Sequence, residues 1–414
     1  MPNNAVDERP LTRPERGLWR LFGPAFVAAV AYVDPGNVAA NLTAGSSYGY
    51  LLLWVLVAAN AMAVLIQYLS AKLGLVTGRT LPQLIGERMG TRGRLAFWGQ
   101  AEIVAAATDL AEVIGGALAL NLLFGIPLVW GGLIVGAVSM ILLAVHSQRG
   151  QRPFEFVIIG LLAIIAVGFT AGLFVAPVDW QDAAAGLVPR FAGPETVLLA
   201  ASMLGATVMP HAIYLHSALA RDRHRASLET RATPRLLRAT RHDVTWSMLV
   251  AGGVNIAMLL LAAASLRGVA GTESIEGAHA ALSSQLGPTI ATIFAIGLLA
   301  SGLAATSVGA HAGAVIMEGL LIRRIPLVAR RVVTLIPALI ILAIGVDPTW
   351  ALVLSQVVLS LGIPFALIPL VRLTALREVL GDYVNRRVTT AAAIVITVLI
   401  IALNVALIVI TISG

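Results

Sequence analysis

The stretch AFVAAVAYVDPGNVAANLTAG, residues 25–45, places an aspartate, a proline, a glycine and an asparagine in the middle of an apolar run. A run of about 20 apolar residues can cross the hydrocarbon core of a bilayer as a helix. Pro35 lacks the backbone N–H that a helix needs and Gly36 adds backbone freedom, so we expect the helix to break beside Asp34 and Asn37. Irregular backbone at membrane depth is tolerated only where it lines a polar cavity. A simpler interpretation is a proline kink in which Asp34 caps the second half of the helix.

The composition of the whole chain agrees with a membrane assignment. Of its 414 residues, 58% are hydrophobic and 12% are charged, and the mean hydropathy is +0.89. Soluble domains carry about 25% charged residues, so this composition excludes a soluble enzyme and a disordered chain. Because the chain contains no cysteine, thiolate metal ligands, redox pairs and disulfides are excluded as well.

The basic residues test how many times the chain crosses the bilayer. Eleven apolar runs occur, at residues 20–44, 49–72, 95–124, 127–146, 154–176, 195–219, 244–267, 288–320, 328–346, 348–371 and 388–412. If the N-terminus is cytoplasmic, all 28 Lys and Arg residues except Arg190 and Arg267 fall in cytoplasmic connections. Basic loops stay in the cytoplasm, so we predict eleven transmembrane helices with the N-terminus inside and the C-terminus outside. The net charge of +7 then reflects membrane topology, and no nucleic-acid partner is expected.

A second break is predicted in the sixth run, where SMLGATVMPHAIYLHSAL, residues 202–219, contains Met209-Pro210-His211. The first run enters the bilayer from inside and the sixth from outside, so the two breaks begin five-helix blocks of opposite topology. Such a pair is the signature of inverted-repeat transporters, whose sites lie between the breaks near the midplane. We therefore predict an all-α polytopic membrane protein with a LeuT-like 5+5 inverted repeat. Its parts are a cytoplasmic tail (1–19), repeat one (20–176), repeat two with its preceding outside loop (177–371), and a linker with the eleventh helix (372–414).

The third run carries three acids, Glu102, Asp109 and Glu112, on one stripe of the expected helix. Acids at membrane depth cannot all face lipid, and burial with mutual repulsion favours proton binding. These residues are therefore candidate proton carriers. They can also pair with arginine, for which Arg330 and Arg331 at the head of the ninth run are candidates. Both interpretations can hold together, because a series of carboxylates and arginines could itself be a proton exit route.

The side chains at the two breaks suggest a metal site. Asp34 offers a hard carboxylate, Asn37 and Gln356 offer amide oxygens, Met209 offers a thioether, and the unwound stretch near Ala206 would add a carbonyl. Magnesium and calcium gain nothing from sulfur, whereas softer divalent transition metals accept it. This donor set favours manganese, iron(II) or cadmium over calcium.

Two of the candidate residues have other interpretations. His211 could bind the metal, but its titration range suits a proton relay better. Gln356, in the tenth run, could instead make an interhelical hydrogen bond.

Four segments closely resemble the natural resistance-associated macrophage protein family: DPGN (34–37), TDLAEVIG (108–115), MPHAIYLHS (209–217) and SQVVLSLGIPFALIPL (355–370). The resemblance runs through essentially the whole chain. It implies a secondary transporter, not an enzyme, that carries Mn²⁺ or Fe²⁺ with protons by alternating access and needs no cofactor. It implies metal contacts from Asp34, Asn37, the Ala206 carbonyl, Met209 and, in some conformations, Gln356. It implies proton transfer through Asp34, His211, Asp109 and Glu112, with Glu102, Arg330 and Arg331 further along, and places His216 at the family's second histidine.

The resemblance also bears on selectivity, location and assembly. Relatives that carry magnesium or aluminium lack the methionine, so Met209 supports transition-metal selectivity. Ala212 departs from the family pattern, in which many members carry asparagine after the MPH segment. The expected location is a bacterial inner membrane, in which a multi-pass monomer sits with divalent metal ions and protons as its partners.

Two alternatives belong to other functional classes. The same inverted-repeat fold could carry a small organic solute with sodium, because half-helix ends can hold carboxylates. Met209 and Asp34 together argue against this alternative, since the carboxylate would repel an anionic substrate. An intramembrane metalloenzyme using His211 and His216 is disfavoured, because a spacing of five residues places the two side chains on different helix faces.

Overall fold

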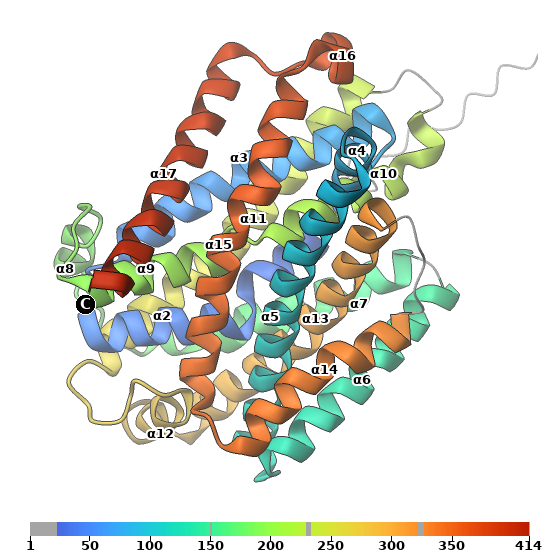
Figure 1. Cartoon of the computed structure of the whole chain (residues 1–414). Coiled ribbons are helices and arrows are strands. Elements are labelled where there is room, and N and C mark those ends of the chain that lie inside the picture. Colours follow the sequence, from blue (N-terminus) through green and yellow to red (C-terminus); the bar gives the residue numbers. More distant parts are fainter. Residues whose placement is uncertain (1–22, 150, 229–232, 322–326, 414) are drawn as a thin grey trace, which may run out of the picture.

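The computed structural model describes residues 23–149, 151–228, 233–321 and 327–413, and the predicted tail of residues 1–19 lies outside them. The described residues form helices and connections, with no strand among them (Figure 1). The α-helices are α1 Pro24–Val30, α2 Pro35–Tyr48, α3 Leu53–Thr77, α4 Leu81–Arg88, α5 Thr91–Phe124, α6 Leu128–Arg149, α7 Gln151–Thr170, α8 Trp180–Ala185, α9 Pro194–Thr207, α10 Pro210–Leu228, α11 Thr233–Ser265, α12 Ile275–Leu286, α13 Pro288–Leu320, α14 Leu327–Ile344, α15 Pro348–Ala375, α16 Arg377–Leu380 and α17 Arg387–Ser413.

The first predicted break is present. Helix α1 ends at Val30, one 3-10 turn covers Ala31–Val33, and α2 begins at Pro35. Asp34 between them is extended, with φ −73° and ψ 168°. Its Oδ1 accepts a hydrogen bond from the Asn37 backbone N–H at 2.8 Å, so Asp34 also caps α2 as the simpler interpretation expected.

The second predicted break is present too. Helix α9 ends at Thr207 and α10 begins at Pro210. The backbone dihedral angles of Val208, φ −105° and ψ 61°, are not helical. Met209 therefore lies in the gap between the two half-helices. The prolines explain both positions, because each half-helix that follows a break begins on a proline, the residue best suited to a first helical position.

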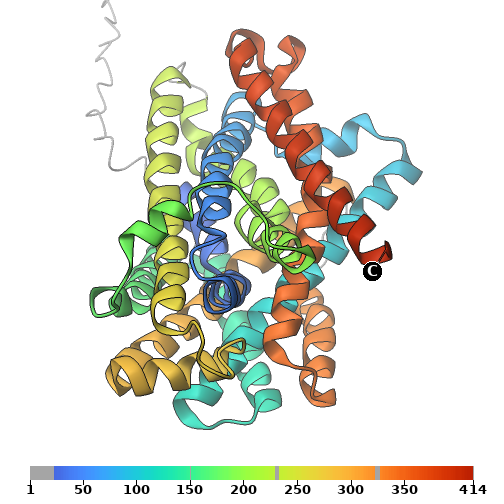
Figure 2. The same ribbon diagram turned by 90° about the vertical axis from the view of Figure 1, so that its left-hand side faces the viewer.

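Eight helices in the described part of the chain are long and apolar enough to cross a membrane, and Pro24–Val33 and Leu128–Leu142 are shorter apolar helices. The predicted number of eleven crossings therefore stays a prediction. The broken pair α9–α10 lies deep, since 89% of its most apolar window is buried, against 22% for α17. Figure 2 shows the blue α2 and α3 near the centre of the view, and Figure 1 shows the red α17 along the outside of the bundle.

Helix α17 is held to the bundle by α15. The Ser360 hydroxyl donates to the Asn404 Oδ1 at 2.7 Å, and the Asn404 amide donates to the Ser360 carbonyl at 2.8 Å. The outer surface of α17 carries exposed apolar side chains such as Val388 and Ile412, each 81% exposed. Such a surface is the one that a lipid-facing helix presents.

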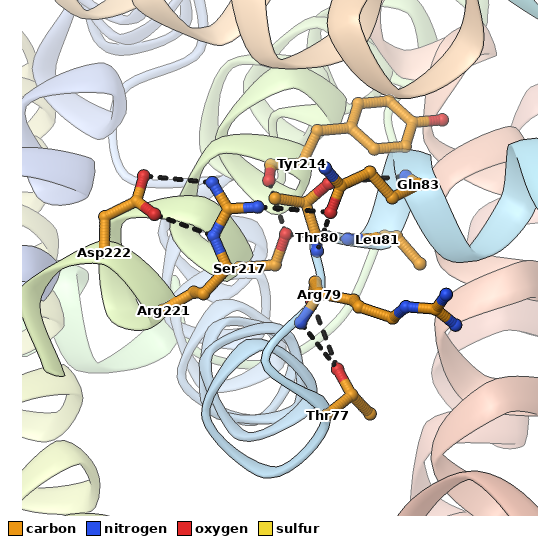
Figure 3. Close-up of polar contacts among 9 residues, drawn as sticks. All are labelled: Thr77, Arg79, Thr80, Leu81, Gln83, Tyr214, Ser217, Arg221 and Asp222. Atoms are coloured by element: carbon orange, nitrogen blue, oxygen red, sulfur yellow. Dashed lines mark hydrogen bonds and ion pairs between the residues drawn. The ribbon is translucent and has the colours of Figure 1, made fainter. Parts of the chain in front are cut away.

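Several short helices lie in the connections. Helix α12 lies in the connection between α11 and α13, and its N-terminus is capped by Ser274. Helix α4, which the hydropathy pattern did not predict, begins with a reciprocal capping box between Thr80 and Gln83. Gln83 also accepts a hydrogen bond from Arg221 at 3.1 Å, and the Leu81 N–H donates to Ser217, so α4 is fastened to α10 (Figure 3).

Candidate metal site

The two breaks meet at the amide group of Asn37. Its Nδ2 donates to the Asp34 Oδ1 at 2.8 Å and to the Ala206 carbonyl at 2.8 Å. Asp34 and Asn37 belong to the first break and Ala206 to the last turn of α9, so oxygens from both halves of the molecule converge on one nitrogen. All three residues are buried, with at most 1% of their surface exposed.

Gln356 of α15 completes this group. Its Nε2 lies 3.4 Å from the Asp34 Oδ2. A Cβ added at Gly36 would lie 1.8 Å from the Gln356 Nε2, and one added at Gly205 would lie 2.0 Å from the Gln356 carbonyl oxygen. Only glycine fits at position 205, where α15 packs directly on the backbone of α9, whereas the glycine at position 36 leaves room for the Gln356 side chain beside α2.

Two oxygens of the site are buried without a partner. Among the described residues, the Asn37 Oδ1 and the Gln356 Oε1 accept no hydrogen bond. An unsatisfied buried carbonyl is costly, and such groups call for an explanation such as an ion that belongs at the site. Rotation of either amide would bring its oxygen toward the Asp34 carboxylate if a cation lay there.

Met209 lies at the second break, immediately before α10, and is fully buried. Its side chain belongs to the large hydrophobic core that also contains Ala212 and Met203. The described residues contain no cluster of three or more His, Cys, Asp or Glu side chains able to hold a metal ion. That finding fits this site, whose candidate donors include one carboxylate beside amide, carbonyl and thioether groups.

The three acids of α5 lie where the sequence placed them, and both arginines reach them. The Arg331 Nη1 lies 3.0 Å from the Asp109 Oδ1, and the Arg330 Nη2 lies 3.1 Å from the Glu102 Oε1. Arg331 also donates to the hydroxyls of Ser139 and Thr306. The expected pairing of carboxylate with arginine is therefore present in the structure.

The third acid, Glu112, is not joined to an arginine by an ion pair within the described residues. Its carboxylate lies against the backbone of α13, where a Cβ at Gly309 would be 2.6 Å from the Glu112 Oε1. One oxygen each of Asp109 and Glu112 has no hydrogen-bond partner in the described part of the chain. These two buried acids thus retain free acceptor positions that a proton can occupy.

The two histidines of α10 have different neighbours. The His211 Nδ1 lies 3.2 Å from the Thr108 hydroxyl, which places it beside Asp109 on α5. The His216 Nδ1 lies 2.7 Å from the Gln67 Oε1 of α3, and Gln67 in turn contacts the Tyr32 hydroxyl. His211 therefore belongs with the acids of α5, whereas His216 belongs to a separate polar group between α3 and the first break.

With this geometry in place, the chain can be compared with known proteins. A model of the natural resistance-associated macrophage protein-like family, Nramp, matches residues 25–410. The chain belongs to this family. The divalent metal cation transporter MntH of Mycobacterium tuberculosis H37Rv is 61% identical over 396 residues, which cover 96% of this chain and 92% of the relative. The Bacillus subtilis protein of the same name is 47% identical over 396 residues, 95% of this chain and 93% of the relative.

Solved structures agree with the fold of this Nramp chain. A manganese transporter of Eremococcus coleocola has a TM-score of 0.84 at 31% sequence identity, covering 95% of this chain and 86% of that one. The structure of MhsT with L-phenylalanine has a TM-score of 0.61 at 13% identity, over 94% and 98% of the two chains. The second likeness concerns the fold alone and supports the LeuT-like architecture that the two breaks predicted.

Polar residues that we did not select from the sequence support the first break of this Nramp chain. The Asn255 amide donates to the Tyr32 carbonyl at 2.7 Å, and the Ser301 hydroxyl donates to the Val33 carbonyl at 2.6 Å. Both carbonyls are freed by the break and would otherwise be unsatisfied in an apolar interior. The available signal was the one amide side chain in the apolar run 244–267 and one of several hydroxyl side chains in the run 288–320.

Asp243 of α11 is a third residue that the sequence did not single out. Its carboxylate accepts hydrogen bonds from the Gly23 N–H at 3.2 Å and the Ala25 N–H at 3.0 Å. Free N–H groups at a helix start attract a carboxylate. Helix α1 is thereby fastened to α11 at the end away from the break.

Proposed function

We propose that this chain is a secondary transporter that imports divalent transition metal ions, Mn²⁺ or Fe²⁺, by alternating access. The observation that carries the proposal is the Asn37 amide, which donates at 2.8 Å to both Asp34 and the Ala206 carbonyl. The amide hydrogens supply the positive charge that a cation would supply between these oxygens. Family membership and the names of the relatives support the same substrate class.

The residues can accommodate a cation with a small rearrangement. Once a metal ion lies between the breaks, the Asn37 amide has to rotate, because its hydrogens would face a cation. Rotation presents the Asn37 Oδ1, which has no partner among the described residues. Gln356 can turn in the same way, so Asp34, Asn37, Ala206 and Gln356 would offer oxygens and Met209 a thioether.

We expect Met209 to set selectivity. Replacing Met209 with alanine should lower the ratio of Mn²⁺ to Ca²⁺ uptake about tenfold, which corresponds to about 1.4 kcal/mol. The reason is that sulfur favours softer ions, whereas Ca²⁺ prefers an all-oxygen shell. Initial uptake rates of both ions in proteoliposomes give this ratio. Met258→Ala, which also removes a fully buried methionine, is the matched control, and equal ratios in the two variants would show that the thioether argument is wrong.

Proton coupling is the second part of the proposal. The Thr108 hydroxyl of α5 contacts His211, and Asp109 is the next residue of that helix. Glu102 lies earlier on the same helix, and its side chain is 24% exposed. A proton released near Asp34 could therefore pass along buried groups toward a partly exposed carboxylate. Arg330 and Arg331 would stabilise the deprotonated acids that such a path requires. His216 stands apart from this series, and we assign it to the neighbouring polar group.

Uptake by purified protein in proteoliposomes tests the proposal as a whole. The initial rate of Mn²⁺ uptake should rise when the outside is made more acidic than the lumen. Vesicles without protein provide the background, and Ca²⁺ with a panel of amino acids, with and without a sodium gradient, should give no comparable signal. Absence of any divalent metal flux would contradict the proposed function, and sodium-driven amino-acid uptake would favour the organic-solute alternative.

The membrane placement completes the proposal. The chain is a multi-pass membrane protein, and we propose a bacterial inner membrane with the N-terminus in the cytoplasm and the C-terminus outside. The distribution of arginine and lysine supports this orientation. We further propose a monomer without a bound cofactor, with residues 20–176 and 177–371 as the two inverted repeats and residues 372–414 as the linker and last helix.

A further inference from the structure

A cavity of about 690 Å³ opens at the side of the bundle, away from the metal site. It lies between α3, α11 and the start of α17. Three basic side chains line one end of it: Lys72 of α3, Arg241 of α11 and Arg386 immediately before α17. These elements are far apart in the sequence, so the fold itself gathers the three charges.

Within the described part of the chain, no acidic side chain balances the positive charge of this cavity. No acidic residue lines the cavity, and none of the three basic side chains makes an ion pair with an acid in the described ranges. Lys72 is only 7% exposed, and its Nζ donates to the Asn385 Oδ1 at 2.8 Å. A buried ammonium with one neutral acceptor is costly, because a charge taken out of water needs a countercharge or several hydrogen bonds. The cavity therefore fits an anionic ligand.

The same cavity has an apolar wall. Ala61, Val64 and Leu65 line it from α3, seven to eleven residues before Lys72. At 1.5 Å per residue, these side chains lie about 10–17 Å from Lys72 along the helix axis. The cavity is thus cationic at one end and apolar along the length that follows, with its apolar part on a helix long enough to cross the membrane.

We propose that this cavity binds the headgroup and upper acyl chain of an anionic phospholipid, such as phosphatidylglycerol. Lys72, Arg241 and Arg386 would hold the phosphate, and the α3 wall would pack against the chain. Basic pockets between transmembrane helices bind acidic headgroups where the bilayer meets the aqueous phase. The apolar wall favours a lipid over a free phosphate ion, because an ion would leave that wall without a partner.

Native mass spectrometry of the full chain in detergent tests this proposal. Protein incubated with phosphatidylglycerol should retain the lipid at least about fivefold more than phosphatidylcholine with the same acyl chains. The double variant Arg241→Gln/Arg386→Gln should lose most of this preference. The control Arg92→Gln/Arg372→Gln removes the same charge from two exposed residues outside the cavity and should keep it. All four arginines are exposed, so thermal melting of the two variants should agree.

Three results would overturn the proposal. Equal retention of phosphatidylglycerol by the two double variants would mean that the cavity charges do not select the lipid. Equal retention of phosphatidylcholine and phosphatidylglycerol would mean that the headgroup charge is not recognised. Displacement of the lipid by millimolar inorganic phosphate would identify a free anion as the ligand. None of these measurements depends on metal transport, so they stand apart from the uptake assays.

Discussion

Replacing Asp34 with asparagine is expected to lower Mn²⁺ uptake about a hundredfold or more while leaving the protein folded. Asparagine caps a helix about as well as aspartate, and its oxygen can accept both bonds that the Asp34 Oδ1 receives from Asn37. What the substitution removes is the negative charge between the two breaks. A hundredfold effect corresponds to about 2.8 kcal/mol, which is modest for the loss of a buried ionic ligand.

This variant separates the two interpretations of Asp34. If Asp34 served only as the cap of α2, the asparagine variant would transport at nearly the normal rate. Uptake in proteoliposomes and thermal melting in detergent should be measured on the same preparations. Asp382→Asn changes an acid whose side chain is 92% exposed and provides the matched control, for which we expect normal uptake.

Replacing Arg331 with methionine is expected to destabilise the protein by about 3–5 kcal/mol. Arg331 has a fully buried side chain that pairs with Asp109 and donates to Ser139 and Thr306. Removing one partner of a buried ion pair leaves an uncompensated charge, and this charge accounts for most of the loss. The melting temperature in detergent and the yield of folded protein should both fall.

The double variant Arg331→Met/Asp109→Asn tests the cause of that loss. Because the stranded carboxylate is then neutral, we expect most of the stability to return, as a double-mutant cycle would reveal. Transport should not recover with it if Asp109 carries protons. Arg92→Met, at an exposed position, is the control. A single variant as stable as this control would show that the buried pair contributes little to the fold.

The features that the sequence predicted best are those with a local cause. Pro35 and Pro210 each remove a backbone donor, and the helices break at these residues. The spacing of Asp109 and Glu112 fixes a shared helix face whatever surrounds it. The candidate arginine partners were limited because few basic residues lie within an apolar run. The LeuT-like fold was predicted from the two proline breaks and from the opposite sides at which their helices enter the bilayer.

The features that the sequence missed depend on which helices become neighbours. Asn255 and Ser301 satisfy carbonyls of the first break from α11 and α13, more than 200 residues along the chain. A single amide or hydroxyl in an apolar run does not reveal its partner. The separation of His216 from His211 has the same origin, because Gln67 of α3 becomes its neighbour only through tertiary packing.

The close contact between Gly205 of α9 and the backbone of α15 has a mechanical consequence. Because Gly205 presents bare backbone to the backbone of α15 at Gln356 and Ser360, no flexible side chain lies at this contact to absorb a displacement. Closely packed interiors transmit strain. A shift of α9 by a fraction of an ångström must therefore push directly on the α15 backbone, so the second break and the helix that carries Gln356 are expected to move together.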